Sequence, residues 1–444
     1  MNWDKLICDK RFGLEDYHQS KPGTRSDFQR DFDRLVFSSP FRRLQNKTQV
    51  FPLPGSIFVH NRLTHSMEVA SVGRSLANEV SSALKAKYAC EPWVDKLDAL
   101  DEIVGAACLA HDLGNPPFGH SGEKSISTFF SEGPGAVLKD ELTEAQWCDL
   151  THFEGNANSL RLLTHQFKGR RPGGFAMTYS MLASIVKYPY ESRLAGRKSK
   201  FGFFTSERET FRRIADELGL LPRPGDGGEM CYSRHPLVYI VEAADDICYE
   251  VMDIEDAHKL RVLTTGEVID LFLAFFGEEQ QERMKRAMGH VEDPNEKIAY
   301  LRSCVIGTLV KQCAKAFVSH EDEILSGDFA GCLLDHVDDL ERDAYRGCSA
   351  LAWDKIYRAS DVVDVELAGS RIISFLMEKL IHAVRYPELN YSSLLLSKVP
   401  NQYDIHADTL FDKVQAVLDH VSGMTDVYAL DLYRKLHGMS LPAV

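Results

Sequence analysis

Several features that mark other classes of protein are missing from this sequence. No apolar run approaches the roughly 20 residues that a membrane-spanning helix needs, and the first residues, MNWD, are not a basic segment followed by an apolar stretch. The ten cysteines are scattered, with neither a CxxC pair nor zinc-ribbon spacing. Alternating strand patterns are scarce. We therefore expect a soluble, cytoplasmic, nearly all-α protein with reduced thiols.

Positive charge is also in short supply. The chain has 51 Lys and Arg against 65 Asp and Glu, a formal net charge of -14. Such a molecule repels anionic membranes and nucleic acid, so we expect neither as its main partner. An anionic ligand must meet a local basic site. Residues 187–213 are one candidate, with eight basic and three acidic residues, although a charge run is mostly a solvated face.

Apolar residues recur at spacings of three and four along most of the chain. Two segments rich in Gly and Pro, 131–140 and 222–230, are expected to be surface loops. At 444 residues the chain exceeds one ordinary compact core, and we expect a catalytic core with an N-terminal extension over 1–260 and a helical C-terminal region over 261–444. The periodicity predicts helices over residues 57–88, 95–113, 154–166, 176–187, 205–218, 236–253 and most of 266–438.

Histidines and aspartates stand at informative places in this pattern. His65 lies within the first predicted helix, and His111 with Asp112 lies in the last turn of the second, which Gly114 is expected to end. Residues 115–120 contain two adjacent prolines and cannot continue that helix, so they should form an ordered loop.

A candidate metal site follows from two imidazoles and two carboxylates: His65, His111, Asp112 and one of Asp245 and Asp246. This donor set suits a divalent cation such as Mn, Mg, Fe or Zn. Each piece alone has an ordinary alternative, since a helix histidine is more often structural and an Asp pair more often a solvated face.

Helical geometry favours one of the two aspartates. Asp245, Tyr249 and Asp253 recur every four residues and share one face of the predicted 236–253 helix, whereas Asp246 points about 100° away. This favours Asp245 as the ligand. The alternative is a core tyrosine beside a solvated acid.

A second pair, His120 and Glu123, is spaced so that the carboxylate can orient the imidazole if the segment is helical. An imidazole held in this way is a suitable proton relay. The alternative is a loop histidine that caps a helix.

The order of these residues resembles the H…HD…D signature of the HD superfamily. Longer motifs resemble bacterial deoxyguanosine triphosphate triphosphohydrolases, and the similarity spans nearly the whole chain. These motifs are NRLTHSMEV (61–69), HDLGNPPFGHSGE (111–123), FEGNA (153–157), KYP (187–189), EAADDICY (242–249) and GMTD (423–426).

The resemblance implies an all-α HD-domain helical bundle with additional C-terminal helices. It implies one divalent metal ion per subunit, Mn or Mg, with Fe, Ni or Zn as alternatives, held by His65, His111, Asp112 and Asp245. The reaction would convert a deoxynucleoside triphosphate and water into a deoxynucleoside and inorganic triphosphate, with dGTP among the substrates.

The resemblance also implies roles for the residues around the metal. His120 and Glu123 would act beside the α-phosphate, Tyr249 would touch the phosphate or sugar, and Asp253 would bind the sugar 3′-hydroxyl. An aromatic ring near the 2′ carbon would leave no room for a ribose hydroxyl, so deoxyribose selectivity would come from exclusion.

Three further residues match substrate contacts of that family. Lys187 and Arg62 match phosphate-site residues, and Gln49 matches a glutamine that contacts the nucleoside. For Gln49 an ordinary surface amide is the alternative.

The same resemblance suggests a homo-oligomer, with a hexamer built from dimers as the common form, and an allosteric nucleotide as a further partner. The base preference stays open. Two other functions remain as alternatives: another HD phosphohydrolase, such as a nucleotide monophosphatase or cyclic-nucleotide phosphodiesterase, or a nucleotide sensor or nucleic-acid-binding protein without turnover.

Overall fold

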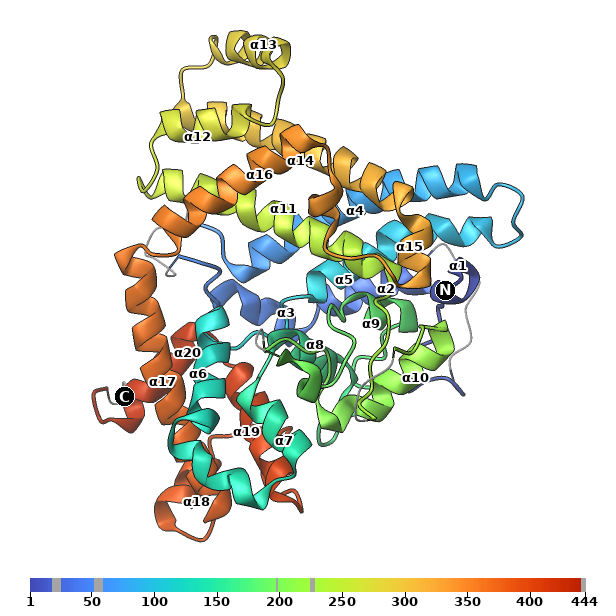
Figure 1. Cartoon of the computed structure of the whole chain (residues 1–444). Helices are drawn as coiled ribbons and strands as arrows, with labels where there is room; N and C mark the ends of the chain where they lie inside the picture. Colours follow the sequence, from blue (N-terminus) through green and yellow to red (C-terminus); the bar gives the residue numbers. More distant parts are fainter. Residues whose placement is uncertain (18–24, 52–58, 197–198, 224–227, 441–444) are drawn as a thin grey trace.

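The computed structural model of the chain describes residues 1–17, 25–51, 59–196, 199–223 and 228–440. Across these ranges the backbone forms helices, joined by turns and isolated β-bridges, and contains no strand. The predicted all-α fold is confirmed (Figure 1).

Most helices contribute to one large hydrophobic core, called here the first core. Short 3-10 helices also occur, namely η1 (Leu44–Asn46), η2 (Val94–Ala99), η3 (Pro134–Glu141), η4 (Ser192–Leu194), η6 (Thr205–Glu207) and η7 (Leu333–His336), with a π-helical turn, η8 (Ala352–Ile356). The α-helices of the first core are α1 (Trp3–Leu6), α2 (Asp27–Val36), α3 (Ser39–Arg43), α4 (Arg62–Lys87), α5 (Leu100–Ala110), α8 (Gly155–Thr164), α9 (Tyr179–Ser184), α10 (Arg208–Leu218), α11 (Pro236–Lys259), α12 (Thr265–Leu273), α13 (Glu278–Met288), α14 (Pro294–Ser319), α15 (Glu321–Ser326) and α16 (Asp339–Leu351).

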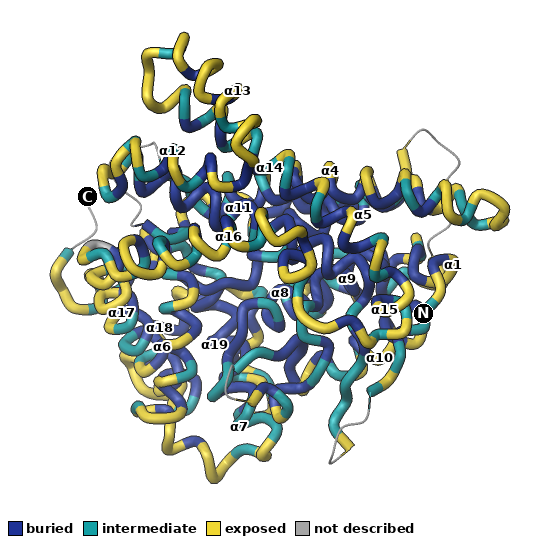
Figure 2. The backbone as a smooth tube through the Cα atoms, turned by 45° about the horizontal axis from the view of Figure 1, so that its top comes forward, coloured by how far each residue is buried: buried dark blue, intermediate teal, exposed yellow. Residues whose placement is uncertain are grey.

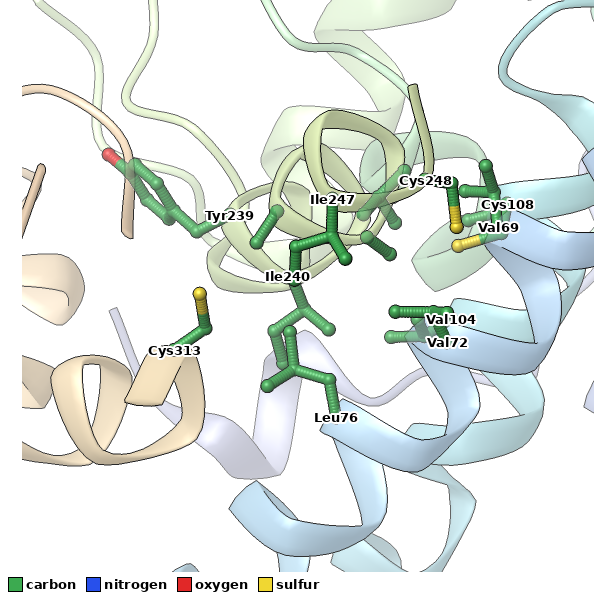
Figure 3. Close-up of a cluster of buried hydrophobic side chains, with 14 of the residues drawn as sticks. Val69, Val72, Leu76, Val104, Cys108, Tyr239, Ile240, Ile247, Cys248 and Cys313 are labelled. Carbon is green, nitrogen blue, oxygen red and sulfur yellow. The ribbon is translucent and has the colours of Figure 1, made fainter. Parts of the chain in front are cut away.

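The centre of the first core lies where α4, α5 and α11 pack together. Leu76 of α4, Val104 of α5 and Ile240 of α11 are buried there (Figure 3). A Cβ on Gly73 would lie 2.6 Å from the Cys108 sulfur, so α4 and α5 approach closely because position 73 has no side chain. This packing fixes the relative placement of α4 and α11, which bear His65 and Asp245, and of α5, which His111 and Asp112 follow.

A second hydrophobic core, called here the second core, brings residues 126–157 together with the C-terminal helices. Phe130, Leu376 and Val417 are buried in it. Helix α8 joins the two cores, because Ala157 packs in the second and Leu160 in the first. The α-helices of the second core are α6 (Gly119–Ser131), α7 (Glu144–Thr151), α17 (Ser360–Arg385), α18 (Asn390–Leu396), α19 (Leu410–Ser422) and α20 (Asp426–Leu436).

Helices that follow residue 260 pack extensively against helices that precede it. Helix α14 lies against α4 and α11, and α17 lies along α6. The division into 1–260 and 261–444 stays a prediction, and the hydrophobic cores that these contacts form draw on both of its parts.

The helix predicted over 95–113 is two elements, η2 and α5. The α-helix ends earlier than expected, so His111 and Asp112 occupy the turn that follows it. The sequence predicts that Gly114 ends this helix, which in fact ends at Ala110. A Cβ on Gly114 would lie 2.2 Å from the carbonyl oxygen of Gly155, so the turn packs directly on the start of α8.

Two predicted loops contain helical structure. Helix α6 begins within residues 115–120, at Gly119, whose φ is 58°. His120 therefore lies in its first turn. Most of 131–140 forms η3, where Pro134 stands at a first helical position that requires no N–H donor.

Buried backbone fills the middle of the molecule, while α13 projects from it and is largely exposed (Figure 2). None of the described helices combines the length and the apolar character needed to cross a bilayer. All ten cysteines are free thiols.

Candidate active site

Three predicted metal ligands come together where α4, α5 and α11 meet. His65 Nε2 lies 3.0 Å from Asp245 Oδ1, and His111 Nε2 lies 3.5 Å from the same oxygen. Potential ligand atoms of these residues all lie within 4.8 Å of one another. His65, His111 and Asp245 are called the metal cluster below.

The orientation of His111 fits a metal ligand. Its Nδ1 donates to the carbonyl of Cys108 at 2.6 Å, so Nε2 is the nitrogen through which His111 could bind a metal. Nε2 is buried and has no hydrogen-bond partner among the described residues. Burial raises the pKa of Asp245, but the two facing imidazoles hold it well below its usual range. A buried lone pair beside a carboxylate is a suitable donor set for a divalent cation.

Asp112 lies next to this cluster but is held by other residues. Its Oδ1 is 3.7 Å from His111 Nε2. Arg62 donates to Oδ2 and Asn115 to Oδ1, both at 2.5 Å. Burial raises the pKa of Asp112, but Arg62 and the imidazoles lower it to about 2. Arg62 is itself buried, so its predicted contact with phosphate stays a prediction.

Tyr249 and Asp253 follow the cluster along α11, as the predicted shared face requires. The Tyr249 and His65 rings are 6.4 Å apart edge to face. Asp253 is buried, and burial raises its pKa well above the usual range. Tyr357 donates to Asp253 Oδ2 at 2.9 Å and stacks on Tyr249 at 5.9 Å. Tyr357 lies outside every sequence motif, which is why sequence reasoning missed it.

His120 and Glu123, called the relay pair below, interact in α6. His120 Nδ1 lies 2.9 Å from Glu123 Oε2, and the N–H of Gly155 donates to Glu123 Oε1 at 2.8 Å. Glu123 raises the pKa of His120. Burial raises the pKa of Glu123, but His120 and Lys200 lower it to about 2. The pair is therefore an imidazole hydrogen-bonded to a buried carboxylate, with Nε2 left to meet a ligand.

Residues of the FEGNA motif (153–157) contact Glu123 of the relay pair. A Cβ on Gly155 would lie 2.5 Å from Glu123 Oε1 and 1.9 Å from Asn115 Oδ1, so this position requires glycine. Glu154 caps α8 and pairs with Lys200, whose Nζ is also 3.8 Å from Glu123 Oε2. Sequence reasoning counted Lys200 only as part of a charge run.

Lys187 lies beside the other end of α11. Its Nζ is 3.1 Å from Glu242 Oε1, and Arg234 binds the second oxygen of Glu242 at 2.9 Å. Burial raises the pKa of the neighbouring Asp246 to about 7, although Lys187 lowers it. Asp246 is not part of the metal cluster.

Gln49 is half-buried, and its Oε1 is enclosed without a hydrogen-bond partner among the described residues. It immediately precedes the loop that leads to 52–58, which lies outside the described residues. An amide oxygen without a donor is consistent with a ligand contact, and the nucleoside contact stays a prediction.

Several basic residues of 187–213 pair with acidic side chains and stay partly exposed, and the expectation of a solvated face for most of the run stays a prediction. Arg193 and Arg208 both pair with Glu191, at 3.4 and 3.1 Å, and Arg213 pairs with Glu15 at 2.6 Å. Glu191 belongs to the same run, whereas Glu15 lies in a distant segment of the chain. Two further basic residues of the run, 197–198, lie outside the described residues.

Comparison with known proteins identifies two family regions. Residues 62–148 match the HD domain, and residues 339–435 match the phosphohydrolase-associated domain. Among curated relatives, a deoxyguanosinetriphosphate triphosphohydrolase-like protein of Pseudomonas aeruginosa is 36% identical, covering 100% of both chains. One of Listeria innocua is 33% identical over 99% of this chain and 100% of its own.

A relative named deoxyguanosinetriphosphate triphosphohydrolase, from Yersinia enterocolitica, is 30% identical over 97% of this chain and 98% of its own. These likenesses extend over the metal cluster, the relay pair and the C-terminal helices together. The chain therefore belongs to the deoxyguanosinetriphosphate triphosphohydrolase-like family of HD-domain hydrolases.

Proposed function

We propose that this protein is a metal-dependent deoxynucleoside triphosphate triphosphohydrolase, with dGTP among its substrates. The observation that carries the proposal is the metal cluster, in which the buried His111 Nε2 faces Asp245 Oδ1 and has no hydrogen-bond partner among the described residues. Curated relatives that cover nearly the whole chain bear the name deoxyguanosinetriphosphate triphosphohydrolase or deoxyguanosinetriphosphate triphosphohydrolase-like protein. The products would be the deoxynucleoside and inorganic triphosphate.

His65, His111, Asp112 and Asp245 would hold one divalent ion per subunit. Manganese or magnesium suits the mixed imidazole and carboxylate set, with iron, nickel or zinc as alternatives. When bound, the ion polarises an α-phosphate oxygen and lowers the pKa of water. Asp112 would join the cluster through the oxygen that lies 3.7 Å from His111.

The relay pair would manage the proton of the reaction. In the hydrolysis a water oxygen bonds to the α-phosphorus, the bond from phosphorus to the 5′-oxygen breaks, and a proton goes to that 5′-oxygen. Glu123 raises the pKa of His120, which favours a protonated imidazole whose Nε2 would give this proton to the leaving alkoxide. The attacking water would lose a proton to solvent as its oxygen bonds to phosphorus, and a proton from solvent would restore the one that His120 gave.

Substrate binding would use the polar residues around the cluster. Lys187 and Arg62 would balance the phosphate charge, and Gln49 would contact the nucleoside. Asp253 would accept the sugar 3′-hydroxyl through Oδ1, since Tyr357 binds Oδ2. Tyr249 would pack against the 2′ carbon.

Assembly and cellular context are part of the same proposal. We expect a cytoplasmic homo-oligomer, with a hexamer as the first form to test, and an allosteric nucleotide as a second ligand. The net charge of -14 argues against nucleic acid or an anionic membrane as the main partner.

The test is product analysis on the purified full chain. Each deoxynucleoside triphosphate and matching ribonucleotide is incubated with Mn or Mg, or with a chelator, and products are separated by anion-exchange chromatography. We expect intact triphosphate and deoxynucleoside to appear together, with monophosphates poor substrates and chelator abolishing turnover. Orthophosphate or pyrophosphate as the first product would contradict the proposal.

A further inference from the structure

The GMTD motif near the C-terminus places a carboxylate between two segments of the candidate site. Asp426, the first residue of α20, is buried. Its Oδ2 accepts the backbone N–H of Thr48 at 2.8 Å, and its Oδ1 accepts that of Phe118 at 2.9 Å. One side chain thus joins segments that are 378 and 308 residues away in the sequence.

Both bonded amides stand beside residues of the proposed site. Thr48 precedes Gln49, and Phe118 stands two residues before His120. Phe118 has φ 64°, a left-handed conformation that residues with side chains rarely adopt. The bond from Asp426 holds this conformation where α6 begins, and the start of α6 decides where the His120 imidazole lies.

Lys47 forms a second link among the same three segments. Its buried Nζ donates to the carbonyl oxygen of Asn115 at 2.5 Å and to that of Ser422 at 2.8 Å. Two backbone carbonyls, one before the prolines 116 and 117 and one at the end of α19, are therefore satisfied by one buried amine. These bonds and those of Asp426 tie three segments together through Lys47, Thr48, Asn115, Phe118, Ser422 and Asp426.

We propose that Asp426 is a positioning residue for the reaction: it fixes the loops that carry Gln49 and His120 relative to each other. The proposal rests on the function proposed above. The proposal gives the C-terminal helices a role in turnover, because Asp426 belongs to α20, a helix of the second core. If Asp426 only stabilised the fold, its substitution would lower kcat equally with and without the His120 imidazole.

The first arm of the test measures local order without activity. Asp426→Asn keeps the size of the side chain but leaves one oxygen to accept two N–H groups. Hydrogen exchange in peptides covering 47–49 and 116–119 should become at least about fivefold faster, while exchange in α4 stays unchanged. Asp431→Asn is the matched control, since Asp431 lies on α20 in an exposed pair with Lys435. Unchanged exchange in both peptides overturns the proposal.

The second arm is a double-mutant cycle with His120→Ala. Asp426→Asn should lower kcat for the best deoxynucleotide by about tenfold to a hundredfold in the wild-type background. In the His120→Ala background the same change should cost less than about threefold. Asp419→Asn, which breaks the buried pair with Arg161 on α19, controls for loss of stability and should show no such coupling.

Equal losses of kcat from Asp426→Asn in both backgrounds would overturn the positioning role and leave a fold-stabilising one. A wild-type chain that hydrolyses no deoxynucleotide would overturn the proposed function and the catalytic part of this inference together. An active enzyme with additive losses overturns the inference alone.

Discussion

The metal cluster and the relay pair are built in different ways, although they face one substrate in the proposed reaction. The cluster lies where three helices of the first core meet, and 2%, 9% and 31% of the His65, His111 and Asp245 side chains are exposed. The relay pair begins a helix of the second core, and 69% of the His120 side chain is exposed. The cluster depends on the packing of three long helices, whereas His120 depends on contacts that distant segments make with the start of α6.

The largest expected effect tests the cluster. Asp245→Ala removes the carboxylate that both imidazoles face, so bound metal should be lost and kcat/KM should fall by more than about a thousandfold. Asp246→Ala is the matched control, one residue away and outside the cluster, and should retain the metal. Elemental analysis of the purified variants measures both. The reverse pattern would reassign the ligand.

The second effect tests the relay pair separately from the metal. His120→Ala or Glu123→Gln should lower kcat by about a hundredfold or more while metal content stays at the wild-type level. Lys124→Ala, at an exposed neighbouring position of α6, is the control. If the relay variants also lost the metal, the two regions would not be separable and the comparison would fail.

The same contrast explains which parts of the site could be predicted from the sequence. Asp245, Tyr249 and Asp253 share a helix, so the period of 3.6 residues suffices to place them on one face. Motif resemblance pointed to the histidines of the cluster. No local pattern links Asp426 to Phe118 or Tyr357 to Asp253, because those contacts depend on how helices 100 to 300 residues apart dock.

The rest of the fold shows the same limit. Helix periodicity located most elements, but it did not indicate that α17 packs along α6 or that charged residues of 187–213 pair with distant acids. Local geometry also shifted one boundary. The left-handed Gly119 starts α6 inside the segment that its prolines marked as a loop.

A smaller effect concerns sugar choice at the far end of α11. We expect deoxynucleotides to be hydrolysed more than about tenfold faster than matching ribonucleotides, and Tyr249→Ala to narrow that ratio. Asp253→Ala should raise KM. Among the described residues Tyr357 is the only side chain that donates a hydrogen bond to the Asp253 carboxyl, and leaving that buried group without a donor in Tyr357→Phe costs about 1–3 kcal/mol.

Steady-state kinetics of Tyr249→Ala, Asp253→Ala and Tyr357→Phe on dGTP and GTP give the rate ratios and KM values that check these effects. Tyr345→Phe is the control for removing a hydroxyl, since its bond goes to the backbone oxygen of Asp246 and not to Asp253. Equal wild-type rates on the two nucleotides would mean that this face of α11 does not select the sugar.

The smallest effect concerns stability in the region that holds the metal cluster. His60 lies between α4 and α11, with Nε2 3.1 Å from Glu68 and Nδ1 2.8 Å from Asp256. Burial lowers the pKa of His60, but Asp256 and Glu68 raise it from 6.5 to about 10. Between these values the folded protein keeps a proton that the unfolded chain has released.

The sign of the pH effect follows from that difference. The stabilisation from His60 is fully present below pH 6.5, and the free energy of unfolding falls as pH rises toward 10, by at most about 1.4 kcal/mol per pH unit for one proton. Urea unfolding at pH 7, 8 and 9 should show this slope in the wild type and a shallower one in His60→Gln. Glu68 lies one turn after His65, and Asp256 lies one turn after Asp253, so His60 links the segments of α4 and α11 that bear these two residues. His60→Gln should lower stability, and equal slopes in both proteins would show that the bridge does not stabilise the fold.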